Sequence, residues 1–203
     1  MNNQNIPSKN FLFPVFLRLE QMRVLLVGAG PVGLEKATAI LSNCPNIQLH
    51  IIAEVVSPEV RALPGNFSGV TITERRFNDD DLIGIQVLFL AINNKELSGV
   101  IYTKAHQLNI LVNVADTPDF CDFYMSSIVQ KGQLKLAIST NGQSPTMAKR
   151  LKEVLNDALP DELDDLIANL NQVRNGLKGD FADKVKQLNE LTSSLKIKEG
   201  GNK

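Results

Sequence analysis

The stretch VLLVGAGPVG, residues 24–33, decides the fold of this chain. The apolar run VLLV suits a buried strand, and it leads directly into Gly28, Gly30 and Gly33 at the spacing GxGxxG. The residues from Pro31 to Leu41 then fit a helix, because proline is tolerated in a first helical turn. A strand, a glycine-rich turn and a helix in this order are typical of dinucleotide binding, with the helix N-terminus facing the phosphates. We therefore assign to cofactor binding Gly28, Ala29, Gly30, Pro31, Val32 and Gly33.

Further apolar runs end at Ala53, Ile92 and Ala115, and each is followed by a polar residue. The strands predicted here are 47–53, 70–73, 87–92 and 110–115, with a helix over 97–108. Strands that alternate with helices at this pace indicate an α/β fold with a Rossmann-type, doubly wound parallel sheet. Ligands of such sheets bind outside the carboxyl ends of the strands. These endings therefore predict one site at one edge of the sheet.

The polar residues after these runs are Glu54, Asn93 and Asp116. Glu54 is placed to accept hydrogen bonds from the adenosine ribose and to repel a 2′-phosphate, which favours NAD over NADP. It could equally be a solvated loop acid, with Val55 or Ser57 making the contact. Asp116 stands near the nicotinamide half of such a site, where a carboxylate can act as a general base. On spacing alone, it could instead organise a turn.

The pattern changes after Asp116. Residues 124–130 and 134–139 read as two strands joined at Lys131-Gly132, and the chain is helical from Ser144 onward. A lone hairpin is marginally stable in water, so we expect it to pair with a second copy in a homodimer. This organisation predicts an NAD-binding domain over 1–120, a dimerisation segment over 121–146 and a helical C-terminal domain over 147–203.

The stretch ISTNGQSPTMAKRLK, residues 138–152, places a polar loop before a helix N-terminus. Asn141-Gly142 suits a turn and Ser144 suits an N-cap. Lys149 and its basic neighbours follow within two turns, so the segment could hold a substrate that carries carboxylates. It could equally be an ordinary capped helix with a solvated basic face.

Composition narrows the function classes. The 203 residues carry a formal net charge of −1, which gives no general attraction to nucleic acid or membrane. No apolar run is long enough to span a bilayer, and no secretory signal is evident, so we expect a cytoplasmic protein. Two cysteines make no disulfide framework, and the two histidines have no zinc-site spacing. We interpret Arg75-Arg76 as surface and Cys121 as a small apolar residue, and we assign no metal ligands.

Three stretches together resemble a known family. They are LFPVFLRLEQMRVLLVGAGPVGLEKA (12–37), NVADTPDFCDFYMSSIV (113–129) and LAISTNGQSPTMAKRLKE (136–153). They are similar to precorrin-2 dehydrogenase, the N-terminal module of siroheme synthases. The resemblance implies oxidation of precorrin-2 to sirohydrochlorin with NAD as hydride acceptor, and in some members insertion of ferrous iron. It also implies a homodimer.

The same resemblance assigns residues. It makes Asp116 the catalytic residue of the NVxDxP motif and adds Asn94 to Asn93 at the cofactor. It also implies that a substrate-binding segment comprises Ser139, Thr140, Asn141, Gly142, Ser144 and Lys149. The family often has Thr-Asp where this chain has Asn93-Asn94, and arginine where it has Lys149. The alternative is an NAD-binding regulatory or sensor protein without catalysis, which would lack an acid at the active edge.

Overall fold

The structure is a computed structural model that describes residues 10–160, 163–177 and 180–191. By its internal contacts the chain divides into two compact units, Met1–Met125 and Ser126–Lys203. The three-domain division expected from the sequence stays a prediction.

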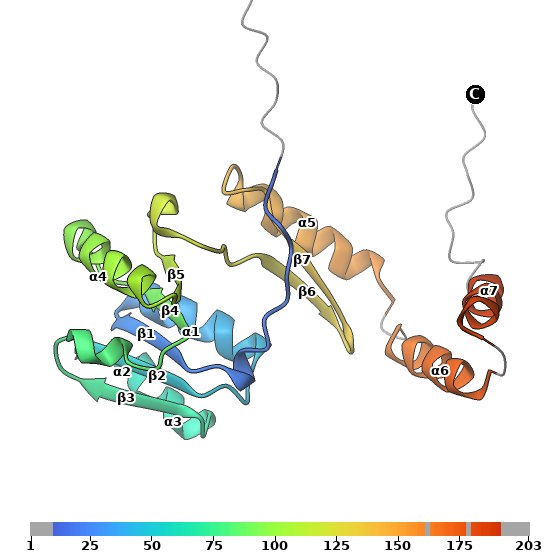
Figure 1. Ribbon diagram of the computed structural model, residues 1–203, viewed down its shortest axis with the longest axis horizontal. Helices are drawn as coiled ribbons and strands as arrows, with labels where there is room; N and C mark the ends of the chain where they lie inside the picture. Colours follow the sequence, from blue (N-terminus) through green and yellow to red (C-terminus); the bar gives the residue numbers. More distant parts are fainter. Residues whose placement is uncertain (1–9, 161–162, 178–179, 192–203) are drawn as a thin grey trace, which may run out of the picture. The chain divides into compact units, whose positions relative to one another are not determined.

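The first unit is built on a five-stranded parallel sheet in the order β3-β2-β1-β4-β5 (Figure 1). The strands are β1 (Val24–Ala29), β2 (Leu49–Val56), β3 (Val70–Glu74), β4 (Val87–Leu90) and β5 (Leu111–Val114). The connecting helices are α1 (Pro31–Asn43), α2 (Pro58–Arg61), α3 (Leu63–Asn66) and α4 (Lys95–Gln107). This arrangement confirms the predicted Rossmann-type sheet. The strand order reverses between β1 and β4, which is the point where such sheets bind ligands.

Apolar side chains of β1 divide between the two faces of the sheet because successive residues of a strand point to opposite sides. Val24 and Leu26 are buried in one cluster with Ala37 of α1. Leu25 and Val27 are buried in the other, with Ile101 of α4. A strand that is covered on both faces must be apolar throughout, which explains why VLLV shows no alternation.

The sequence placed several strand ends incorrectly, and two of them lie beside the predicted site. β2 was expected to end at Ala53, but it continues to Val56, so Glu54 lies within the strand. The extension follows from an irregularity between Val27 and Ala29 of β1, after which Ala29 pairs with Val56. The opposite error occurs at β4, which ends at Leu90 and not at Ile92.

The second unit begins with an antiparallel pair, β6 (Ser127–Lys131) and β7 (Leu134–Ile138). Gly132 in the turn between them has a φ of 52°, a left-handed value that favours glycine. α5 (Pro145–Ala158) packs against both strands. It is followed by α6 (Leu163–Gly176) and α7 (Phe181–Leu191). The predicted hairpin is confirmed, although β6 begins at Ser127 and not at residue 124, and it includes Lys131, which was expected in the turn. The helical C-terminal part is confirmed over the described residues.

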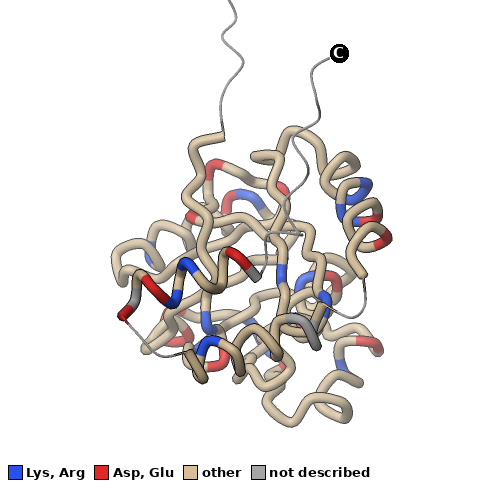
Figure 2. Tube along the Cα trace, turned by 90° about the vertical axis from the view of Figure 1, so that its right-hand side faces the viewer, with Lys and Arg blue, Asp and Glu red and all other residues tan. Residues whose placement is uncertain are grey.

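Charged residues of the two signs are mixed along the chain, and no long apolar helix is present among the described residues. Figure 2 shows Lys and Arg interspersed with Asp and Glu along the chain, as the formal net charge of −1 leads one to expect. Within residues 10–160, 163–177 and 180–191, no helix has both the length and the apolar character needed to cross a membrane.

Candidate active site

Gly28 and Gly33 allow the turn after β1 to pack closely. Gly28 has a φ of 108°, and a Cβ at this position would lie 2.3 Å from the carbonyl oxygen of Ala91. A Cβ on Gly33 would lie 2.2 Å from the carbonyl oxygen of Gly28. Real Cβ atoms do not come so close to backbone atoms, so only glycine lets α1 start directly against the strand ends.

Gly30 has a different environment from its two neighbours. A Cβ built on it meets no atom within 4 Å, and its φ is an ordinary −85°. The residue is the N-cap of α1, and Pro31 follows at the first helical position. Open space beside the N-terminus of a helix suits an anion such as a pyrophosphate, which must approach the backbone closely.

A cavity of about 920 Å³ lies at this edge of the sheet, and residues at or just after the carboxyl ends of all five strands line it. Glycine-turn residues form one part of the wall, and Asp116 and Thr117 after β5 form another. Of the residues predicted to bind the cofactor, the cavity is lined by Gly28, Ala29, Gly30, Pro31, Val32, Glu54, Asn93 and Asn94. Gly33 is absent from the lining because it is buried against Gly28. The structure therefore brings the predicted cofactor residues and the predicted catalytic residue into one cavity.

Asn94 also has a structural role. Its side-chain oxygen accepts a hydrogen bond from the backbone N–H of Leu97 at 2.9 Å, so it caps the N-terminus of α4. The hydroxyl of Ser98 donates to the backbone carbonyl of Asn94 at 2.9 Å. These bonds fix the wall of the cavity that lies after β4.

Asp116 has an exposed side chain and a φ of 53°. This left-handed conformation is uncommon outside glycine, although aspartate adopts it more readily than most residues. Such conformations persist where the surrounding structure holds them, and they cluster at functional sites. The local bonds must therefore hold the turn that carries this carboxylate.

The Cys121 thiol holds this turn. Its sulfur accepts from the backbone N–H of Val114 at 3.3 Å and lies 3.2 Å from the Val114 carbonyl oxygen. It also lies 3.4 Å from the carbonyl oxygen of Thr117. The thiol therefore reaches both sides of Asp116. Burial raises the pKa of Cys121, which keeps the S–H proton in place as a donor. The interpretation of Cys121 as a merely apolar residue was wrong.

A second polar network lies behind the turn. Lys36 of α1 donates to the side-chain oxygen of Asn113 at 2.6 Å. Asn113, which is only 4% exposed, donates in turn to the backbone carbonyl of Phe123 at 2.8 Å. Desolvation lowers the pKa of Lys36, while the charges of the Glu35 and Asp116 carboxylates act to raise it. A half-buried cation thus lies within electrostatic range of Asp116.

Glu54 and Arg76 meet at the opposite end of the cavity, and both line it. Arg76 donates through Nε to a carboxylate oxygen of Glu54 at 3.1 Å. The sequence interpretation placed Arg76 on the surface, and its side chain is indeed 84% exposed, but it also lines the cavity. It does so because β3 runs parallel to β2, so its carboxyl end delivers a residue to the same edge.

The predicted substrate segment lies in the second unit. Ser144 caps α5 by accepting from the backbone N–H of Met147 at 3.2 Å. Asn141 and Gly142 both have positive φ, 54° and 74°, as the predicted turn requires. Lys149 is exposed on α5, and the hydroxyl of Thr140 accepts from the backbone N–H of Ser144 at 3.1 Å. The local geometry confirms the turn and the cap, whereas contact of Ser139 through Lys149 with a substrate stays a prediction.

Sequence reasoning missed Lys36, Cys121, Asn113, Thr117 and Arg76. A signal existed for Lys36, because it lies one helical turn after Gly33 and so on the same side of α1. No local signal marks Cys121 or Asn113, since their roles depend on how the chain returns to β5 after Asp116. Among the described residues, no group of three or more His, Cys, Asp or Glu side chains is arranged to hold a metal ion.

Two protein families match parts of this sequence. Residues 15–127 match the family described as "Putative NAD(P)-binding", and residues 131–158 match the family described as "Sirohaem biosynthesis protein central". The first match covers the glycine turn, the whole sheet and Asp116. The chain belongs to the putative NAD(P)-binding family.

Relatives of this chain include siroheme synthases. Siroheme synthase 3 of Aeromonas hydrophila is 34% identical over 169 residues, which are 83% of this chain and 36% of that protein. The siroheme synthase of Psychrobacter cryohalolentis is 35% identical over 148 residues, which are 73% of this chain and 28% of that protein. The chain thus spans about a third of the length of these curated relatives. They confirm the resemblance to siroheme synthases.

A solved structure supports the fold. The protein "SirC, precorrin-2 dehydrogenase" superposes with a TM-score of 0.71 at 22% sequence identity. The match covers 92% of this chain and 94% of that one. It confirms the fold class of a parallel sheet with helices, a hairpin and C-terminal helices.

Proposed function

We propose that this chain oxidises precorrin-2 to sirohydrochlorin and uses NAD as the hydride acceptor. The observation that carries the proposal is that Asp116 and the glycine turn line one cavity at the switch point of the sheet. The match to the putative NAD(P)-binding family and the siroheme synthase relatives support it. The likeness to a precorrin-2 dehydrogenase agrees with it at the level of the fold.

The residues present fit a dinucleotide. Open space at Gly30 admits a pyrophosphate to the N-terminus of α1. Glu54 offers a carboxylate to the adenosine ribose, and Asn93 and Asn94 line the wall between the glycine turn and Asp116. When bound, NAD supplies the acceptor for a hydride.

The protein's own chemical contribution is at Asp116. Oxidation of the macrocycle removes two hydrogens, one as hydride and one as a proton, and both electrons leave with the hydride. The Asp116 carboxylate accepts the proton as a general base. The left-handed turn presents that carboxylate to the cavity, and the Cys121 thiol holds the turn. Carboxylate groups of the substrate would be bound by the capped helix at Ser144 and by Lys149.

Asp116→Asn tests the proposal. The amide cannot accept the proton, so we expect the rate of NADH formation from precorrin-2 to fall at least about a hundredfold, the usual scale for an acid–base group. NADH affinity, measured by fluorescence titration, should stay near the wild-type value. The assay uses the purified chain with NAD and enzymatically generated precorrin-2 under anaerobic, metal-free conditions.

Asp119→Asn is the matched control. Asp119 is an exposed aspartate three residues further on and does not line the cavity. Its rate should match that of the wild type. Equal rates for Asp116→Asn and wild type would overturn the catalytic assignment. NADH binding without any NADH formation by the wild type would favour the regulatory or sensor alternative.

Iron insertion, a cytoplasmic location and a homodimer belong to the proposal as well. Ferrous iron as a further substrate would be tested by adding it to the same reaction and following the siroheme spectrum. A cytoplasmic location stays a prediction. A homodimer through the second unit is part of the proposal because α5, which packs against the hairpin, leaves Met147, Leu151 and Val154 exposed within one chain.

A further inference from the structure

Two neighbouring arginines follow β3, and the structure gives them different roles. Arg75 forms two hydrogen bonds with the Asp81 carboxylate, at 2.8 and 2.5 Å. The Asp81 side chain is only 8% exposed and also accepts from the backbone N–H of Asn78 at 2.8 Å. Arg75 is therefore anchored to the body of the first unit. Arg75 does not line the cavity.

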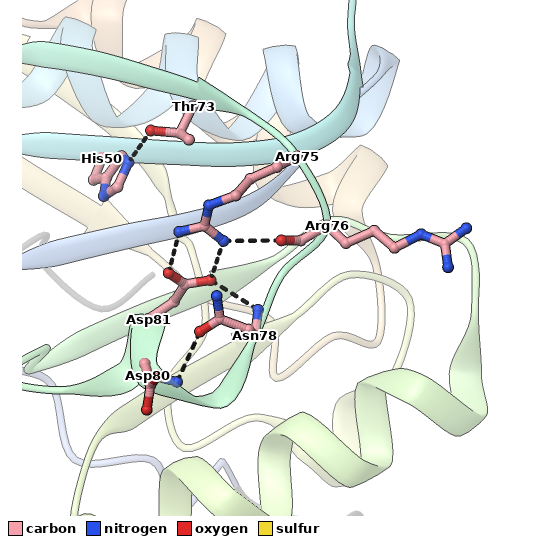
Figure 3. Close-up of polar contacts among 7 residues, drawn as sticks. All are labelled: His50, Thr73, Arg75, Arg76, Asn78, Asp80 and Asp81. Carbon is pink, nitrogen blue, oxygen red and sulfur yellow. Dashed lines mark hydrogen bonds and ion pairs between the residues drawn. The ribbon is translucent and has the colours of Figure 1, made fainter.

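Arg75 also fixes the backbone of Arg76. Its guanidinium donates to the carbonyl oxygen of Arg76 at 2.8 Å. Figure 3 shows the two side chains extending in opposite directions, Arg75 toward Asp81 and Arg76 away from it. The bidentate pair thus holds the backbone from which Arg76 reaches the edge of the cavity.

Arg76 pairs with the residue expected to read the ribose. The distance from its Nε to the Glu54 carboxylate is 3.1 Å, and the two side chains are 84% and 60% exposed. An ion pair so accessible to water is weak, and one nitrogen bonded to one oxygen leaves the rest of the guanidinium fork available. The guanidinium can therefore exchange Glu54 for another anion at little cost.

The chemistry of the two dinucleotides differs at this point. NADP carries a 2′-phosphate on the adenosine ribose, which a carboxylate repels and an arginine binds in a bidentate manner. Glu54 alone would select against that phosphate, whereas Arg76 alone would select for it. The two residues face the same end of the cavity with opposite preferences.

We propose that Arg76 is a second specificity residue of the cofactor site, and that Glu54 selects NAD by both repelling the 2′-phosphate and occupying Arg76. This inference rests on the proposed dinucleotide binding and deepens it. Loss of the Glu54 charge releases the guanidinium, which then binds the 2′-phosphate. The preference of the site for NAD over NADP is thus set by Glu54 and Arg76 together and not by Glu54 alone.

The experiment measures NADH and NADPH affinity by fluorescence titration of the full chain. For Glu54→Gln we expect NADPH affinity to rise at least about tenfold relative to NADH, the scale of one hydrogen bond to a charged group. Adding Arg76→Gln to Glu54→Gln should abolish that rise. Wild type should prefer NADH.

A charge-matched control separates a direct contact of Arg76 with the 2′-phosphate from a general electrostatic effect of removing one positive charge. Arg61 is an exposed arginine that donates to Glu74 at 2.8 Å and does not line the cavity. Adding Arg61→Gln to Glu54→Gln removes the same charge as Arg76→Gln, but it should leave the gain in NADPH affinity intact.

Three results would overturn the inference. The NADPH gain could survive in the Glu54→Gln/Arg76→Gln variant, or Arg76→Gln could weaken NADH and NADPH equally, as expected of a residue that stacks on adenine. Alternatively, the Arg61 control could abolish the gain as well. In all three cases NADH still binds, so the proposed function stands. Absence of binding of either dinucleotide by the wild type would instead refute the proposed function itself.

Discussion

Gly30 differs from the other two glycines of the turn in what a methyl group would meet. At Gly28 and Gly33 the methyl would lie within 2.3 Å of a carbonyl oxygen, whereas at Gly30 it would enter open space. The motif thus combines residues that the protein needs for packing with one that the ligand needs. Substitutions should separate the two requirements.

Gly30→Ala should therefore leave the fold intact and weaken dinucleotide binding. We expect NADH affinity to fall about tenfold or more, since the methyl group occupies the space that the pyrophosphate needs. The free energy of unfolding should change by no more than about 1 kcal/mol, since the methyl group meets no atom and only the preference of an N-cap for glycine over alanine is lost. Fluorescence titration and thermal denaturation measure the two effects.

Gly33→Ala is the matched contrast, because its methyl group meets the backbone of Gly28. It should destabilise the protein by roughly 1–3 kcal/mol, the typical cost of overpacking. If both variants lost stability equally, the distinction between a ligand-facing and a packing glycine would be wrong.

At the residue scale, the sequence predicted what is local. Glycine spacing, the N-cap at Ser144 and the left-handed Asn141-Gly142 turn can be read from short stretches, and the structure confirms each of them. Arg76 and Cys121 could not be read in this way. Their roles depend on the partners that parallel pairing and the turn after Asp116 bring to them.

At the scale of elements, the turn between β5 and the 3-10 helix Pro118–Phe120 is the part that function depends on most. Cys121→Ala removes the group that reaches both Val114 and Thr117. We expect the oxidation rate to fall roughly tenfold to a hundredfold, since small misplacements of a catalytic group cost that much. NADH affinity should not change, because the thiol does not line the cavity.

Cys121→Ser provides the conservative comparison. Its hydroxyl can donate and accept in the same direction as the thiol, so it should restore most of the rate. Cys44→Ala, at the C-terminal end of α1, removes a thiol elsewhere and should have no effect on the rate. A wild-type turnover number in Cys121→Ala would show that the turn holds Asp116 without the thiol.

The elements themselves were largely predictable, and their ends were not. Apolar runs located four strands of the parallel sheet, because strands covered on both faces must be apolar, whereas the edge strand β3 alternates apolar residues with threonine. The end of β2 was misplaced because Glu54 and Val55 are exposed and give no strand pattern. Pairing of Val56 with Ala29, a contact remote in sequence, extends the strand past them.

At the scale of the whole molecule, the second unit has features that point to self-association. α5 buries Ala148, but beside it Met147, Leu151 and Val154 are 53%, 41% and 61% exposed within one chain. They recur at helical spacing and form one apolar stripe. A second copy of the chain would bury this stripe.

Val154→Glu tests the homodimer. Sedimentation of the wild type at micromolar concentration should show a dimer, and a charge in the stripe should shift it toward monomer, because burial of an unpaired carboxylate is costly. NADH affinity should persist, since the cavity residues all belong to the first unit. Asn156→Glu, at an exposed polar position of the same helix, adds the same charge outside the stripe and should stay dimeric.

A monomeric wild type would end the dimer proposal. A dimer that persists in Val154→Glu would show that association uses another surface of the chain.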